Sequence, residues 1–222
     1  MMRKTKNATL CLLFAFLFVC AAVLPSCGAS APAVEDLRAD VASLLAAAPK
    51  INEVFFGVGL PVFDRADPAN EALYYEVPES MAIYDVVDIS KSDYDSVSDI
   101  REAALRVYSE ACMAPIFSSA FDGVSSNLLP DTTLIKSPVF IEQDGFFYQL
   151  RRSEYDLNYN SIADRQLSFD LSTLRVTKPS SQSSVSLSVS ATNLLTPSAS
   201  PIILTFRILS TPSGWRLDTL VV

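Results

Sequence analysis

Pro138 to Arg152, PVFIEQDGFFYQLRR, is the stretch at which the period of the apolar residues changes. Two runs rich in Phe, Tyr and Ile flank Asp144-Gly145, a dipeptide typical of the tight turn of a β-hairpin. Before this stretch apolar residues recur at helical spacing, and after it they alternate with polar residues. The stretch therefore predicts a hairpin and divides the chain into a helical first part and a stranded second part.

Helices are predicted before the hairpin. Residues 35–48, EDLRADVASLLAAA, carry an apolar stripe, and Pro49 is expected to end or kink that helix. Ser98 is a suitable N-cap for a second helix over DIREAALRVYSEACMAPIFSSAF, within which Ser109 could cap a third. The segment of residues 61–96, which lies between the first two predicted helices and is rich in acidic residues, is expected to be irregular, with one or two short strands.

Strands are predicted after the hairpin. In SVSLSVSAT the residues Val185, Leu187 and Val189 alternate with serines, so one face of that strand should be buried and the other wet. Helices first and antiparallel strands second predict an α+β fold, with N-terminal helices packed on one curved antiparallel sheet, a cone or roll.

The N-terminus carries an export signal. Residues 2–7, MRKTKN, are basic, and Leu10 to Leu24 is an unbroken apolar run of 15 residues. Such a run suits a signal peptide and is shorter than the ~20 residues that cross a bilayer. We predict a signal peptide over residues 1–26, an attachment and tether segment over 27–34, and one domain over 35–222.

Cys27 follows the apolar run directly. Leu24-Pro25-Ser26-Cys27 resembles the lipoprotein box of bacteria, with Pro25 departing from the usual small or aliphatic residue. The resemblance implies lipidation of Cys27 and an anchor on the outer face of the bacterial cell membrane. Simple secretion, after cleavage at a small-residue site, is the alternative.

Composition excludes several classes of active site. The chain has no His, so a Ser-His-Asp triad, a Cys-His pair, His-ligated zinc and haem on a proximal His are all ruled out. Its six glycines are too scattered for a phosphate-binding loop.

The leader holds three of the 17 basic residues and none of the 25 acidic ones, so the remaining chain has a net charge of −11. Such a charge disfavours nucleic acid, and we predict no enzyme activity, metal or cofactor.

Several short motifs suggest a family. These are Tyr108-Ser109-Glu110, Asp122-Gly123, the Glu-Gln-Asp-Gly turn at 142–145 and Gly214-Trp215. Their order over residues 35–222 resembles the nuclear-transport-factor-2-like (cystatin-like) cone domains of exported proteins in low-GC Gram-positive bacteria. Within that group the chain is most similar to the secreted inhibitors of cell-wall DL-endopeptidases. The resemblance implies a cone-shaped α+β domain with one of two uses. Cone domains often bind a ligand in the concave pocket between sheet and helices, and some are enzymes, whereas the inhibitor branch blocks a peptidase by surface contact.

Three functions fit these observations. The first is a non-catalytic lipoprotein that binds an envelope protein or wall ligand and restrains a cell-wall hydrolase. The second is a small-molecule binder, or an enzyme, that uses the pocket between sheet and helices. Its candidate residues are Tyr108, Glu110, Tyr148 and Arg151, with Arg152 beside them. The third is a subunit of a larger envelope assembly.

Overall fold

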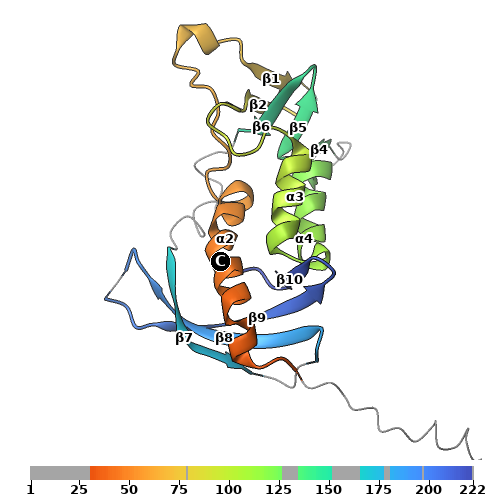
Figure 1. The fold of residues 1–222 in the computed structure, drawn as a ribbon. Coiled ribbons are helices and arrows are strands. Elements are labelled where there is room, and N and C mark those ends of the chain that lie inside the picture. Colours follow the sequence, from red (N-terminus) through yellow and green to blue (C-terminus); the bar gives the residue numbers. More distant parts are fainter. Residues whose placement is uncertain are drawn as a thin grey trace, which may run out of the picture. The chain divides into compact units, whose positions relative to one another are not determined.

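The fold is α+β, as the sequence predicts (Figure 1). The computed structural model describes residues 31–78, 80–126, 135–151, 166–177, 181–196 and 198–221. The predicted signal peptide, Cys27 and Arg152 lie outside these residues. The described elements are α2 (Val34–Phe56), η1 (Pro68–Asn70), β1 (Tyr74–Val77), β2 (Ala82–Val86), α3 (Val97–Val107), α4 (Glu110–Phe117), η2 (Ser118–Asp122), β3 (Val124–Ser126), β4 (Ile135–Ser137), β5 (Phe140–Gln143), β6 (Phe146–Leu150), β7 (Leu167–Val176), β8 (Ser184–Asn193), β9 (Ile202–Thr211) and β10 (Gly214–Leu217).

Helix α2 continues past Pro49 to Phe56, so of the two expected effects of Pro49, an end or a kink, the end is wrong. The helix stays apolar on one side across this position, and Leu45, Ala48 and Ile51 are all buried. Burial of that face outweighs the hydrogen bond that proline removes. In the part of the chain that the structure describes, no helix is both long enough and apolar enough to cross a membrane.

Ser96, not Ser98, caps α3. The Ser96 hydroxyl accepts the Asp99 N–H at 3.1 Å and donates to the Asp99 carboxylate at 2.6 Å. In this cap the side chain of the third helical residue accepts a hydrogen bond from the capping hydroxyl. A cap at Ser98 would put Arg101 in that place, and a guanidinium is only a donor. The predicted cap at Ser109 is confirmed, since its hydroxyl accepts the Cys112 N–H at 3.1 Å.

The strands that the sequence assigns to one curved sheet divide between two antiparallel four-stranded sheets. Sheet 1 has the order β1-β2-β6-β5, and sheet 2 has the order β10-β9-β8-β7. A separate pair joins β3 to β4. The predicted hairpin is confirmed as β5–β6, but β6 takes its other partner, β2, from the segment before α3. That segment lacks a strong alternating pattern, and this explains why the second sheet is absent from the prediction.

Sheet 2 covers the main core. Val185 and Leu187 on β8 have no exposed surface, and they lie opposite Ile208 and Phe206 on β9. The serines between them face outward, as predicted. Helix α2 packs against β7 and β10, and α3 packs against α2 and β10 (Figure 1). The helices therefore bury the apolar face of this sheet.

Sheet 1 has apolar residues on both faces. One face places Phe140 and Phe147 in the main core. The other carries a separate aromatic cluster around Tyr84 and Tyr148, against which Tyr75 packs. Sheet 1 joins the helices through α3, which contacts β5. The loop end of the β5–β6 hairpin lies beside the start of that helix.

Candidate functional site

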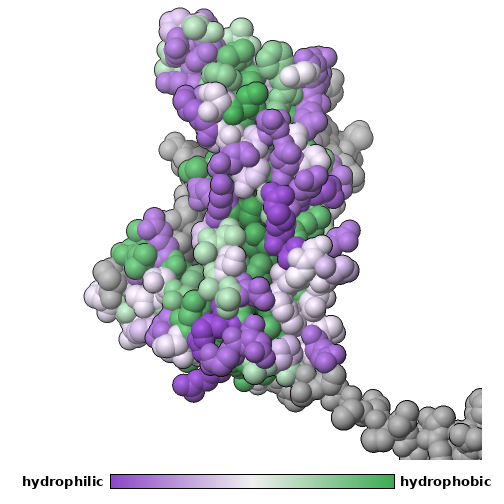
Figure 2. All heavy atoms as spheres, viewed as in Figure 1, coloured by the Kyte–Doolittle hydropathy of each residue, from purple (hydrophilic) through white to green (hydrophobic). Residues whose placement is uncertain are grey.

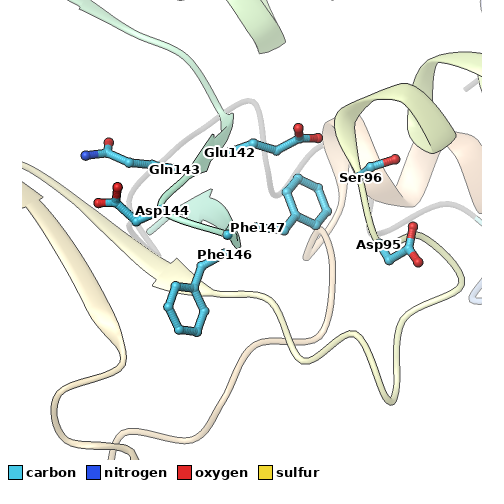
Figure 3. Close-up of a pocket in the computed structure, with 8 residues that line it drawn as sticks. Asp95, Ser96, Glu142, Gln143, Asp144, Phe146 and Phe147 are labelled. Atoms are coloured by element: carbon cyan, nitrogen blue, oxygen red, sulfur yellow. The ribbon is translucent and has the colours of Figure 1, made fainter.

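An acidic cavity opens where the β5–β6 hairpin meets the segment before α3. We call it the hairpin site, and it is lined by Asp95, Ser96, Glu142, Gln143, Asp144, Gly145, Phe146 and Phe147 (Figure 3). Its volume is about 330 Å³. Three of these residues are carboxylates, and none is Lys or Arg. The site therefore has the charge and size to receive a cationic group.

The hairpin turn sets which side chains face the cavity. Asp144 and Gly145 both have positive φ, 52° and 82°, as the primed two-residue turn requires. Alternation along β6 then sends neighbouring phenylalanines to opposite faces. Phe147 is 5% exposed and its ring lies between Glu142 and Ser96, whereas Phe146 is 48% exposed and points away from them (Figure 3).

Glu142 ties the hairpin to α3. Its Oε1 accepts the Val97 N–H at 2.6 Å, at the first residue of the helix. The backbone N–H groups at a helix start have no partner within the helix, and a carboxylate there also meets the positive end of the helix dipole. Glu142 is therefore a positioning residue, although it is exposed like Asp95 and Asp144, the other two acids of the site.

The acids at the start of α3 influence one another. A hydrogen bond with Asp99 raises the pKa of Asp95, and the negative charges of Asp99 and Glu142 raise it further. The hydrogen bonds from Asp95 and Ser96 lower the pKa of Asp99. Across the described residues, no three acidic, Cys or His side chains converge in a way that could hold a metal ion. A cationic side chain, in contrast, needs no such convergence.

Tyr108 and Glu110, two predicted pocket residues, lie near each other in sequence but in different surroundings. Tyr108 is fully buried, and its hydroxyl donates to Asn52 Oδ1 at 2.8 Å. Asn52 in turn donates to the Val221 carbonyl at 2.6 Å, so this network joins α2, the end of α3 and the end of the described chain. Burial raises the pKa of Tyr108 to about 12. Glu110 is exposed in the first turn of α4.

Tyr148 and Arg151 lie on and just after β6. Tyr148 is 8% exposed, within the aromatic cluster of sheet 1. Arg151 forms an ion pair with Asp85 on β2, with its Nε 2.9 Å from Oδ2. None of the four predicted residues lines the hairpin site.

A second cavity lies between α2 and α3. It has a volume of about 500 Å³ and includes the small residues Ala46, Ala47 and Ala103. Lys50 and Arg106 lie at its edge, and Lys50 pairs with Asp93 at 2.8 Å. We call it the helix groove. Its two cations distinguish it from the hairpin site.

Sequence reasoning identifies the parts of the hairpin site but does not assemble them. The Asp144-Gly145 turn and the acidic segment around Asp95 are each visible in the sequence. Their proximity depends on the bond between Val97 and Glu142, which are 45 residues apart. The sequence signal that could indicate this contact is an acid two residues before a predicted turn. A helix start needs an acceptor of this kind, because its first backbone N–H groups have no partner within the helix.

A scan against protein-family models and a search of curated proteins each find no significant match to this chain. The carboxylates attract a Lys or Arg side chain, and the exposed ring of Phe146 offers an apolar or cation–π contact beside them.

Proposed function

We propose that this protein is exported, is anchored to the outer face of the cell membrane through lipid on Cys27, and binds a basic surface of another envelope protein. The hairpin site is the observation that carries the proposal. It combines the exposed acids Asp95 and Asp144 with the exposed ring of Phe146, and its lining holds no basic residue. Its role is binding, without chemistry of its own.

The charge of the chain supports a basic partner. A net charge of −11 on the chain after the leader steers a positively charged surface toward it, and the acids at the hairpin site fix the orientation. Asp95 and Asp144 lie at opposite ends of the site, so each would meet a different Lys or Arg of the partner (Figure 3). Because exposed charges are screened by ions, such binding should weaken as salt increases.

The proposed partner is a cell-wall hydrolase with a basic cleft. The support comes from the resemblance of the motifs to secreted DL-endopeptidase inhibitors, and from the position of α2 and α3 against the apolar face of sheet 2. The cone architecture implied by that resemblance is proposed for this part of the fold. The lack of His in the whole sequence agrees with an inhibitor rather than a hydrolase.

The experiment is an inhibition assay with the lipoprotein purified from membranes. We expect micromolar protein to slow peptidoglycan hydrolysis by envelope hydrolases, and inhibition to decrease when salt is raised. No inhibition at any salt concentration would refute the proposed target. Labelling with a palmitate analogue tests the anchor: wild type should carry label and Cys27→Ala should not, and an unlabelled wild type would refute the anchor alone.

The helix groove favours a second candidate function, binding of a small anionic ligand. Arg106 supplies positive charge among its lining residues, where the Tyr94 ring also lies, while Lys50 is paired with Asp93. A thermal-shift screen of small carboxylates and phosphates tests this function. Stabilisation that is lost in Arg106→Ala would support it, and no shift by any anion would reject it.

A further inference from the structure

The loop end of the β8–β9 hairpin exposes four large aliphatic side chains. Leu194, Leu195, Ile202 and Ile203 are 55%, 50%, 43% and 76% exposed. They are four of the ten large hydrophobic residues that the described part of the chain exposes, and the other six are spread over separate elements. We call these four residues the aliphatic tip. Figure 2 shows hydrophobic side chains at the left of the view, where this hairpin ends in Figure 1.

The sequence around the aliphatic tip carries no charge. From Pro179 to Phe206 there is no Asp, Glu, Lys or Arg, in a chain with 25 acidic residues. A protein-binding surface usually has a polar rim with some charge, whereas entry into a lipid interface is opposed by every charge that must leave water. The lack of charge therefore favours a lipid surface as the partner.

Backbone hydrogen bonds organise the aliphatic tip. The N–H of Leu194 donates to the Gln166 carbonyl at 2.7 Å, beside the start of β7. Within the turn, the N–H of Thr196 donates to Asn193 at 3.1 Å and that of Ala199 donates to Thr196 at 2.9 Å. Backbone groups that are already paired are the ones that a lipid environment tolerates. The tip can thus approach lipid without leaving these groups unsatisfied.

We propose that the aliphatic tip inserts into the interface of the membrane that holds the lipid anchor. The inference rests on the proposed function, which puts an anchor at Cys27. Six residues separate Cys27 from Val34, the first residue of α2, and the seven Cα–Cα steps between these two residues span at most about 25 Å. The domain is thereby held close to the bilayer, where a weak second contact acts at high effective concentration.

The membrane contact of the tip is apolar rather than electrostatic. It requires no anionic lipid and is insensitive to salt, because no basic residue lies in the uncharged stretch. This behaviour is opposite to that expected of the hairpin site. The contact adds a second point of attachment to the lipid anchor, and two points limit how the domain can rotate over the membrane.

The test uses the lipidated protein in phosphatidylcholine vesicles with Leu195→Trp in a Trp215→Phe background. Met81→Trp in the same background is the matched control, since Met81 is 71% exposed and lies just before β2 in sheet 1. Brominated phosphatidylcholine should quench about half of the emission at position 195 and leave position 81 nearly unchanged, at low and high salt alike. Both variants should unfold at the denaturant concentration of the Trp215→Phe parent.

The outcomes separate the tip from the anchor. Protein that is in the membrane fraction but shows no quenching at position 195 overturns the inference and leaves the anchor standing. Equal quenching at positions 195 and 81 also overturns it, since the association is then unspecific. If the emission at position 195 changes with protein concentration and not with bromolipid, the tip contacts a second copy of the protein, and the inference is overturned. Protein that is not anchored, yet is quenched at position 195 when mixed with vesicles, would support the tip and refute the anchor.

Discussion

Sheets 1 and 2 have the same number of strands and the same antiparallel pairing, but they use their faces differently. On β8 of sheet 2 the inner residues Val185 and Leu187 are fully buried, and serines take the outer face. Sheet 1 buries Phe147 on one face, while its hairpin carries Asp144 and the exposed Phe146. From this difference we expect most of the stability to come from sheet 2 and the helices, and the end of sheet 1 is where we propose that a partner binds.

The largest effect is expected at the inner face of sheet 2. Leu187→Ala should lower the free energy of unfolding by about 2 to 5 kcal/mol, because it leaves a cavity where the side chain has no exposed surface. Its neighbour Ser188 faces outward, so Ser188→Ala should change the value by less than about 0.5 kcal/mol. Denaturant titration measures both, and equal costs would break the distinction between the two faces.

The buried network of Tyr108 should cost less when it is disrupted. Tyr108→Phe leaves the Asn52 oxygen without its donor and should lower the free energy of unfolding by about 1 to 3 kcal/mol near neutral pH. The pH dependence is a second readout. The folded protein keeps Tyr108 protonated up to about pH 12, whereas an unperturbed tyrosine ionises near 10.0, so wild type should lose stability between these values. That part of the loss should disappear in Tyr108→Phe; if it persists, the pKa of another group is responsible.

The cap of α3 gives an intermediate effect, and it lies at the hairpin site. Ser96→Ala should lower the free energy of unfolding by about 1 kcal/mol, since the Asp99 N–H loses its acceptor. Ser98→Ala, two residues later on the exposed surface, is the matched control and should have almost no effect. A larger cost at Ser98 would mean that α3 starts where the sequence suggests.

The smallest effect on stability is expected at Phe146. Because its side chain is about half exposed, Phe146→Ala should change the free energy of unfolding by less than about 0.5 kcal/mol and yet weaken hydrolase inhibition. Phe147→Ala, one residue along the same strand, should cost about 3 to 5 kcal/mol because that ring is buried. Unchanged inhibition by Phe146→Ala would remove this ring from the binding surface.

The two sheets were not equally predictable. The alternation around Leu187 specifies which face of β8 is buried, and Asp144-Gly145 specifies the β5–β6 turn, so both follow from local pattern. Sheet 1 as a whole does not follow, since β6 pairs with β2, more than 60 residues earlier in the chain. Pairing over such a distance leaves no signal in the sequence that links the two segments. For the same reason Asp95 and Glu142 are visible as acids but not as neighbours.

Predictions from the sequence are wrong where the local preference of a residue and its tertiary packing disagree. Pro49 predicts an end or a kink in α2, but the helix continues through it, with buried residues on both sides. Tyr108 looks like a pocket residue by its motif and is a core residue by its environment, with Asn52 as its partner. Neither outcome depends on the residue alone, because each is decided by what packs against it.

The most direct test compares two charge-matched variants in the inhibition assay. Asp95→Asn/Asp144→Asn removes two exposed acids from the hairpin site, and Asp40→Asn/Glu71→Gln removes two exposed acids elsewhere. We predict that the first variant inhibits wall hydrolysis at least about tenfold less strongly than wild type, while both variants unfold like wild type. Equal inhibition by the two variants would contradict the account, because net charge alone would then explain the binding.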